Sequence, residues 1–403
     1  MAARLGLPGH DQLQHFVASP AWDDAPLWRV LAERADRLVG GPGAVLVIGD
    51  TALPKKGALS VGVDRQRCGR PGKKAGCQAL VSLTPAGREM PVPVGLRLVP
   101  PEGWSADPAR CAAAGVPESE IVPRGKGEIA LAELDRLRAA GARFGLVLAD
   151  AGHGAGAAFR RRVPPRLGRA GPDLGGGTPR NQEVHGADAR LVPPGGRKRR
   201  PVPDQEPREA EEVPAGLPWR RVTWRHGTKG PLAARFAATR IRVGDGATWG
   251  DNRHPFGAEV WPAGGWRTGG EREHHLGSLP PRTSLRALAA ATEARRACER
   301  AHRQLKQELG LGHFGGRSWT GPHRHALMAR AAFAYLQHLR LAWHRPTGPG
   351  GNAAPRSGTA AITEPAGGAP RRHGAPGRRP RRADPMPLLQ TALPTASLPE
   401  LPR

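Results

Sequence analysis

The first half of the chain consists of apolar runs separated by turns rich in glycine and proline. Apolar residues recur at helical spacing from 27 to 38, which predicts a short helical segment within residues 1–43. The next run, Val45-Leu46-Val47-Ile48, is apolar without a break, as in a strand buried on both faces, and it leads into Asp50. Further strands are predicted at 59–65, 77–84 and 92–98.

A helix and a second buried strand are predicted between residues 126 and 150. The stretch KGEIALAELDRLRAAG at 126–141 places its apolar side chains on one face and ends on glycine, which is typical of an amphipathic helix. FGLVLAD then repeats the earlier pattern of a buried strand that ends on an aspartate, here Asp150. The Ala-Gly-His-Gly turn that follows lets the backbone approach closely. The order of strands and helix predicts an α/β fold with the first part of its core at 44–159.

The second half of the chain changes pattern twice. Residues 160–215 are dense in Pro, Gly and Arg with little apolar periodicity, so we expect an irregular, solvated linker there. Residues 216–280 form short alternating runs between Gly-Thr-Lys-Gly and Gly-Asp-Gly turns, which predicts a small antiparallel β domain. Residues 281–345 are predicted to be helical, with an apolar helix at 327–343, and residues 346–403 to be a disordered basic tail.

The composition favours a polyanionic partner. Lysine and arginine outnumber acidic residues 61 to 35, and the formal net charge of +26 indicates nucleic acid before an anionic membrane. GC-rich coding DNA would also raise Arg, Gly and Pro, so charge alone does not decide. The four cysteines form no C-x-x-C pair, which argues against a zinc or redox site, and the basic loop at 69–76 lacks the spacing of an NTPase P-loop. The sequence shows no signal-peptide-like or membrane-spanning run, and we expect a cytoplasmic protein.

Asp50 and Asp150 are the first candidates for catalysis. Each follows a buried strand, and if those strands are neighbours in a mixed sheet the two carboxylates meet at one edge of it. Two such carboxylates can bridge a pair of Mg²⁺ ions roughly 4 Å apart. A turn aspartate would explain either residue alone, whereas two matched strand ends favour a metal site.

A helix predicted from 285 to 310 carries the next candidate residues. On an α-helix, Arg295, Glu299, His302 and Lys306 fall within one narrow stripe. A lone carboxylate between cations suits neither a core face nor an ordinary solvated face. We therefore expect Glu299 to be the last metal ligand and the cations, with His302 as a candidate phosphate or water contact, to face a nucleic-acid backbone.

Other basic and aromatic residues extend the candidate DNA surface. Lys55 and Lys56 lie in the turn after the first buried strand, where they suit phosphate contact, although a hairpin turn explains them equally well. In the predicted β domain, Trp224 and Lys229 suit a basic ribbon against DNA, with Trp219 offering a second stacking face. A place in the core is the alternative for both tryptophans.

Taken together, these stretches resemble bacterial insertion-sequence transposases of the DDE type. The resemblance lies in VIGDTALPKKG, LADAGHG and ELGLGHFGGRSWTGPHRHALM, and in the spacing Arg295-x3-Glu299-x6-Lys306. That spacing matches the Tyr-x2-Arg-x3-Glu-x6-Lys signature of the cut-and-paste branch with a β domain inserted before the glutamate. The similarity covers roughly residues 10–345.

The resemblance implies a ribonuclease-H-like mixed sheet flanked by helices, and a catalytic triad of Asp50, Asp150 and Glu299. The triad would hold two Mg²⁺ or Mn²⁺ ions, and Arg295 and Lys306 would contact DNA phosphates near the scissile bond. The implied reaction is nicking at the ends of a mobile element followed by transfer of the 3′ end to target DNA. Double-stranded DNA would be the partner, bound by a homodimer in a synaptic complex at the bacterial nucleoid.

The sequence departs from the family pattern at Thr292, where the signature has Tyr, and over residues 160–178. A compensated frameshift in a decaying gene is our hypothesis for the second departure. Two alternatives to an active transposase remain open: a ribonuclease-H-like nuclease without strand transfer, and a noncatalytic DNA-binding remnant.

Overall fold

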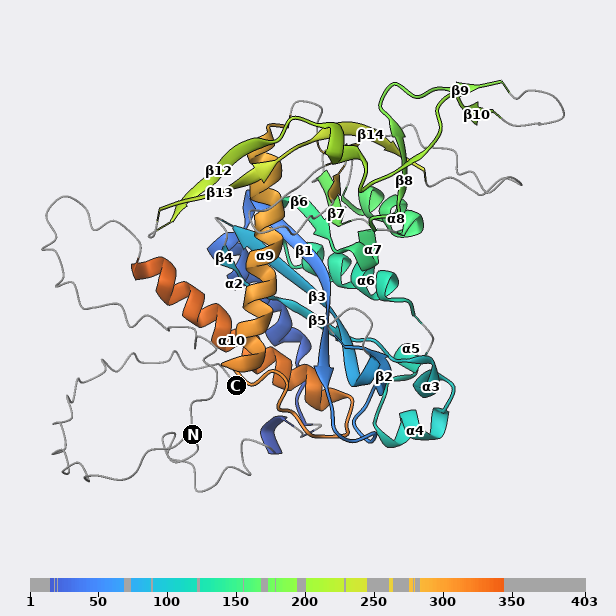
Figure 1. Cartoon of the computed structure of the whole chain (residues 1–403). Helices are drawn as coiled ribbons and strands as arrows, with labels where there is room; N and C mark the ends of the chain where they lie inside the picture. Colours follow the sequence, from blue (N-terminus) through green and yellow to red (C-terminus); the bar gives the residue numbers. More distant parts are fainter. Residues whose placement is uncertain are drawn as a thin grey trace, which may run out of the picture. The chain divides into compact units, whose positions relative to one another are not determined.

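One mixed sheet organises the described part of the chain (Figure 1). The computed structural model describes residues 15–17, 19, 21–68, 74–87, 90–121, 124–154, 156–167, 173–177, 179–193, 201–227, 230–244, 261–263, 275–277, 279 and 283–343. The centre of the sheet has the strand order β2-β3-β1-β6-β7. These strands are β1 (Gly41–Pro54), β2 (Val63–Arg67), β3 (Lys74–Gly87), β6 (Phe144–Ala149) and β7 (Asp173–Gly177).

The directions of the central strands define the fold class. Strand β3 runs antiparallel to both β1 and β2, whereas β6 runs parallel to both β1 and β7. The short strands β4 (Met90–Pro91) and β5 (Gly95–Leu98) pair with β3. This order and these directions are those of a ribonuclease-H-like sheet, so the predicted fold class is confirmed.

Both faces of the sheet are buried, as the unbroken apolar run of β1 predicts. Leu46 and Ile48 point into the larger hydrophobic core, and Val47 points into a separate cluster on the opposite face. The larger core is closed by α2 (Ala25–Val39) and α6 (Lys126–Ala139), and α10 (Thr320–Trp343) packs against α2 and β5. Strand β1 begins at Gly41, a little before the predicted boundary at 44.

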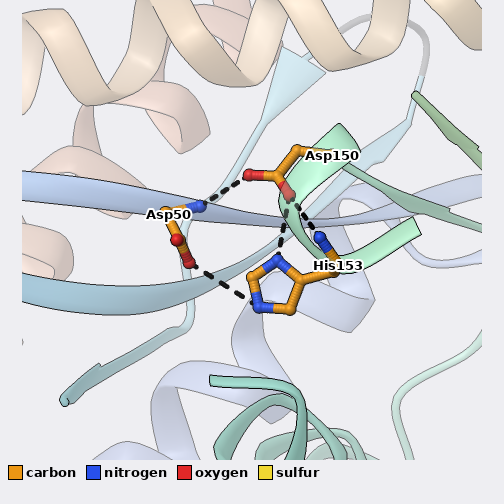
Figure 2. Close-up of side chains that lie close together, drawn as sticks. All are labelled: Asp50, Asp150 and His153. Carbon is orange, nitrogen blue, oxygen red and sulfur yellow. Dashed lines mark hydrogen bonds and ion pairs between the residues drawn. The ribbon is translucent and has the colours of Figure 1, made fainter. Parts of the chain in front are cut away.

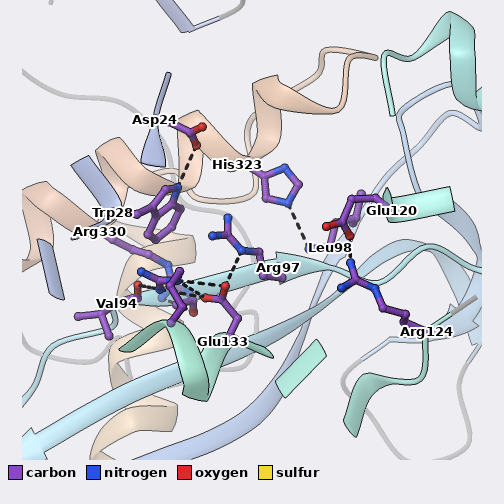
Figure 3. A network of polar contacts seen from close by, with 12 residues as sticks. Asp24, Trp28, Val94, Arg97, Leu98, Glu120, Arg124, Glu133, His323 and Arg330 are labelled. Carbon is purple, nitrogen blue, oxygen red and sulfur yellow. Dashed lines mark hydrogen bonds and ion pairs between the residues drawn. The ribbon is translucent and has the colours of Figure 1, made fainter. Parts of the chain in front are cut away.

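A buried polar network ties α6 and α10 to β5 (Figure 3). The Glu133 carboxylate accepts from Arg97 Nε at 2.7 Å and from Arg136 Nη2 at 2.9 Å. Arg330, which is fully buried, donates to the Gly95 carbonyl oxygen at 2.8 Å. Arg97 and Arg136 also lie 5.3 Å and 5.7 Å from the centroid of the Trp28 ring. The network fixes α6, whose first residue reaches the candidate site.

Helix α9 (Leu285–Gln307) covers the opposite face of the sheet (Figure 1). Ala291, Ala294 and Cys298 pack with Val47 and Leu148, which places α9 over β1 and β6. Ser284 caps the helix by accepting a hydrogen bond from the Ala287 N–H at 3.2 Å. The helix predicted at 285–310 is thus confirmed, and it lies against the strand that carries Asp50.

The predicted linker at 160–215 is wrong in its first part. Residues 157–167 form helix α8, because Phe159, Val163 and Leu167 recur at every fourth position and are buried despite two internal prolines. Strand β7 follows, with three glycines in five residues, and therefore gave no apolar signal. A Cβ on Gly177 would lie 3.0 Å from both the Ala151 nitrogen and Arg295 Nη1, so close packing accounts for a glycine there.

The predicted β domain is also less separate than expected. Strands β14 (Thr239–Val243), β15 (Trp261–Ala263) and β16 (His275–Gly277) continue the central sheet from β7, and β8 (Glu183–Gly186) and β11 (Arg208–Glu209) extend it further. Among the described residues, the strands that form sheets of their own are β12 (Arg220–Gly227) with β13 (Gly230–Phe236), and β9 (Leu191–Val192) with β10 (Val202–Pro203).

The remaining elements are short. They are α3 (Glu102–Ser105), α4 (Pro108–Ala113), α5 (Glu118–Ile121), α7 (Ala151–Gly154) and the 3-10 helix η2 (Val213–Gly216). No helix in the described ranges is long and apolar enough to cross a membrane. The tail predicted at 346–403 lies outside the described residues.

Candidate metal and catalytic site

The two aspartates meet as the sequence predicts, although Asp50 lies within β1, which continues to Pro54, and only Asp150 follows the end of its strand (Figure 2). Strands β1 and β6 are parallel neighbours with Ile48 opposite Ala149, so Asp50, two residues further along β1, lies beside Asp150, which directly follows β6. The Asp50 N–H donates to Asp150 Oδ2 at 3.1 Å. The Asp150 N–H donates to the Ile48 carbonyl oxygen at 3.0 Å. The sheet itself therefore fixes the relative position of the two carboxylates.

His153 joins the two aspartates and was missed by the sequence analysis. It lies on α7, one turn after Asp150, and its backbone N–H and Nδ1 lie 3.0 Å and 2.9 Å from Asp150 Oδ1. Its Nε2 lies 3.6 Å from Asp50 Oδ1. The side chain is only 1% exposed and packs against Phe159. The Asp-x-x-His spacing across a strand end and a first helical turn was the available signal.

Hydrogen bonds hold Asp150 in its ionised form. Burial raises the pKa of this carboxyl group, but the bonds from His153 and from the Asp50 N–H outweigh burial and lower the pKa to about 2. Burial lowers the pKa of His153, and the neighbouring carboxylates of Asp150 and Asp50 outweigh it, so the net shift is upward. At neutral pH the site therefore presents Asp150 as a carboxylate whose position His153 fixes.

Lys126 is the second residue that sequence reasoning missed. It begins α6, and its ammonium group forms an ion pair with Asp50 Oδ2. The Lys126 side chain is 46% exposed, against 27% for Asp50. A contact across 76 positions between the first residue of a helix and a residue within a strand leaves no local signal, so only the fold shows it.

The Asp50, Asp150 and His153 side chains fit a divalent metal ion. Each offers one ligand atom, and these atoms all lie within 4.8 Å of one another. His153 Nε2 is buried and has no hydrogen-bond partner, as expected of a ring nitrogen that faces a ligand position. Carboxylate oxygens are the preferred ligands of Mg²⁺ and Mn²⁺, and imidazole extends the range toward softer ions.

Glu299 does not join this cluster in the described structure. Its carboxylate instead pairs with Arg295 Nε at 3.2 Å, and its side chain is 58% exposed. Arg295 in turn reaches the end of β7, where a Cβ on Gly177 would lie 3.0 Å from both its Nη1 and the Ala151 nitrogen. Helix α9 thus passes beside the residue that follows Asp150, and the role of Glu299 as a third ligand stays a prediction.

Two of the lysines predicted to contact DNA hydrogen-bond to carbonyl oxygens of the protein itself. Lys306 Nζ donates to the Ala52 carbonyl oxygen at 2.9 Å, and Lys55 Nζ to those of Gly312 and Phe314 at 3.3 Å and 2.5 Å. Burial lowers the pKa of both lysines. These bonds tie β1 to α9 and to the loop after it.

His302 likewise lies between α9 and β3. Its Nε2 is 2.6 Å from Ser82 Oγ and its Nδ1 is 2.9 Å from the Cys298 carbonyl oxygen. Burial lowers the pKa of His302 to about 3, so the ring is neutral at physiological pH. A neutral ring with both nitrogens engaged has nothing to offer a phosphate, and the geometry therefore favours a packing role.

The remaining predicted contacts divide into exposed and packed residues. Lys56 is exposed beside β1. Trp224 packs edge-on against Phe236 with ring centroids 6.0 Å apart and belongs to a cluster that includes Ala289 of α9. This packing favours the core interpretation of Trp224. Lys229 lies outside the described residues.

Comparison with known proteins places these observations in a family. A family model described as DDE superfamily endonuclease matches residues 1–231, more than half of the chain. The chain belongs to the DDE superfamily endonucleases. The matched residues include Asp50, Asp150 and His153, whereas Glu299 lies beyond the match. The resemblance is thereby confirmed for the DDE type, while the insertion-sequence branch stays a prediction.

One solved structure shows a distant likeness to this chain. It is the cryo-EM structure of the piggyBac transposase synaptic complex with hairpin DNA, at 10% sequence identity and a TM-score of 0.34. The alignment covers 76% of this chain and 55% of that chain, so this chain spans little more than half of the solved protein. A search of curated proteins finds no match.

Proposed function

We propose that this protein is a transposase that cuts DNA at the ends of a mobile element and joins the 3′ ends to target DNA. The observation that carries the proposal is the meeting of Asp50, within β1, and Asp150, just after its parallel neighbour β6, with the Asp50 N–H donating to the Asp150 carboxylate. Family membership supports the nuclease chemistry. The formal net charge of +26 supports double-stranded DNA as the partner.

Asp50, Asp150 and His153 would hold the divalent ions, Mg²⁺ or Mn²⁺. When bound, such ions activate the attacking oxygen and stabilise the leaving oxygen of a phosphodiester. The protein's own part is to keep the ligands in place. The Asp50 N–H and His153 fix the two Asp150 oxygens, and the sheet fixes the backbone of both aspartates.

Helix α9 would supply the third carboxylate and a phosphate contact. Glu299 is exposed, and among the residues that the structure describes its ion-pair partner is Arg295, on the preceding turn of the helix. In the proposed active arrangement, Glu299 turns from Arg295 to the aspartates, and Arg295 pairs with a DNA phosphate instead. Lys56 and the exposed Arg300 and Arg303 of α9 add positive charge for the DNA backbone. Synapsis of two element ends would require a homodimer.

The test uses a supercoiled plasmid and pre-cut DNA ends taken from the sequence that flanks the gene. With Mg²⁺ or Mn²⁺ we expect nicked plasmid and joined products, and Asp50→Asn should abolish both. Nicked plasmid without joined products would indicate a nuclease that does not transfer strands.

A noncatalytic DNA-binding remnant is the second candidate, because Glu299 pairs with Arg295 and not with the aspartates. In that case wild-type protein and the Asp50→Asn variant would bind DNA equally, and neither would cut it.

A further inference from the structure

Lys126 places a positive charge on the candidate metal site from a fixed helix. Its backbone begins α6, where Gly125 is the N-cap and its N–H donates to Glu128 Oε2 at 3.2 Å. The helix is anchored by apolar side chains in the main core, among them Ile129, Leu134 and Leu137. The side chain itself is half exposed, so its ammonium group can leave Asp50 for solvent without any movement of the helix.

The contacts of the two carboxylates show which atom Lys126 occupies. Both Asp150 oxygens accept hydrogen bonds from fixed groups, Oδ2 from the Asp50 N–H and Oδ1 from His153. Asp50 Oδ1 faces His153 Nε2 at 3.6 Å. Asp50 Oδ2 pairs with Lys126, and within the described part of the chain that oxygen makes no other hydrogen bond or ion pair. Among the described residues, Asp50 Oδ2 is therefore the carboxylate oxygen of the cluster that faces neither a backbone N–H nor His153, and Lys126 occupies it.

A divalent ion and an ammonium group cannot share this oxygen closely. Two positive unit charges about 4 Å apart repel each other by about 1 kcal/mol in water, and a divalent ion doubles this repulsion. The aspartates in turn repel each other, so a site without a cation needs another positive charge beside them.

We propose that Lys126 is a resident counter-cation of Asp50, which competes with the divalent ion for this carboxylate and so lowers the metal affinity of the site. The inference rests on the proposed function, since it assumes that the aspartates bind a divalent ion. Lys126 is then a positioning residue that exchanges between Asp50 and solvent. Replacing it with an uncharged residue should tighten metal binding, whereas loss of an ordinary metal-site neighbour would weaken it.

The experiment measures Mn²⁺ binding to the full chain without DNA, by isothermal titration calorimetry and by the electron paramagnetic resonance signal of free Mn²⁺. Lys126→Met keeps the length of the side chain and removes its charge, and we expect it to bind Mn²⁺ about tenfold more tightly than wild type, or about 1.4 kcal/mol. Lys126→Arg should stay near the wild-type affinity. Arg138→Met, at the other end of α6, removes the same charge far from the site and should change nothing.

A second measurement separates the inference from a general loss of stability. Without metal, Lys126→Met should melt at a lower temperature than wild type, because Asp50 loses its counter-ion, and saturating Mn²⁺ should raise its melting temperature by more than it does for wild type. Equal or weaker Mn²⁺ binding by Lys126→Met, with wild type binding normally, would overturn the role of Lys126 alone. Failure of both proteins to bind Mn²⁺ would overturn the metal site and the proposed function with it.

Discussion

The backbone N–H of Asp50 donates to Asp150 Oδ2 at 3.1 Å although the two residues are 100 positions apart. The bond links the backbone within the central strand β1 to the side chain that follows its parallel neighbour β6. A carboxylate held by a peptide N–H cannot rotate freely, and a rigid ligand costs less entropy when an ion binds. The sheet thus fixes the orientation of the Asp150 carboxylate in the absence of a metal ion.

The two aspartates should be indispensable for DNA cutting. Asp50→Asn and Asp150→Asn preserve side-chain volume and remove the negative charge that a divalent ion requires, so we expect nicking to fall at least about 100-fold in each. The measurement is the rate of plasmid nicking in Mg²⁺, with circular dichroism to verify the fold. Asp135→Asn, an exposed change on α6, is the matched control and should nick at the wild-type rate. Retained activity in Asp150→Asn would contradict the site.

His153 should matter through the orientation of Asp150. His153→Ala removes the ring that contacts Asp150 Oδ1 but leaves the backbone N–H bond, and we expect a loss of about 10- to 100-fold in metal affinity or nicking rate. Since the side chain is buried, thermal melting must accompany the assay. His185→Ala replaces another buried histidine of the same exposure class, on β8, and should spare metal affinity. An equal effect of both variants on Mn²⁺ affinity would show that His153 acts through stability alone.

The sequence was informative wherever side chains carry the signal. Unbroken apolar runs predicted β1 and β6, and the amphipathic pattern predicted α6, so the meeting of Asp50 and Asp150 followed from local patterns and one assumption about strand order. Strand β7 was missed because its glycines have no side chain to show burial. Helix α8 was missed because two consecutive prolines, Pro164 and Pro165, argue against a helix even though apolar residues recur at every fourth position.

Contacts between distant segments were beyond local reasoning. Lys126 reaches Asp50 only because α6 packs against the sheet with its first residue beside Asp50 of β1. His302 shares the charged stripe of α9 but lies against Ser82, a distinction that depends on how the helix is rotated on the sheet. The spacing of residues shows which of them share a face of the helix. How the helix packs on the sheet decides which residues of that face are buried and which are exposed to solvent.

Glu133 should make the protein sensitive to acid. Burial raises the pKa of this carboxyl group, but Arg97 and Arg136 outweigh it, and the folded-state pKa is lowered. Because the folded-state pKa lies below the unfolded-state pKa of about 4.3, the ionised carboxylate contributes its full stability above the unfolded-state pKa. This contribution is lost as the pH falls through the folded-state pKa. Urea denaturation from pH 7 to pH 3 should show this loss.

The same network predicts a large effect of Glu133→Gln at neutral pH. The change leaves Arg97, Arg136 and the buried Arg330 without their shared carboxylate, and we expect a loss of about 3–5 kcal/mol in the free energy of unfolding. Asp135→Asn, which breaks the exposed contact with Arg166, should cost less than about 1 kcal/mol. Equal costs for the two variants, or a Glu133→Gln protein that keeps its acid sensitivity, would contradict this account.

Glu299 is the sharpest test of the proposed function. Its side chain is 58% exposed and pairs with Arg295, so Glu299→Gln should leave the melting temperature within about 1 °C of wild type. If Glu299 turns to the aspartates in the active complex, the same change should lower plasmid nicking at least about 100-fold. Glu308→Gln, at the end of the same helix, removes another exposed carboxylate and should nick normally. A Glu299→Gln protein that cuts DNA at the wild-type rate would leave Asp50, Asp150 and His153 as the complete ligand set, and α9 would then serve as a basic cover for the sheet.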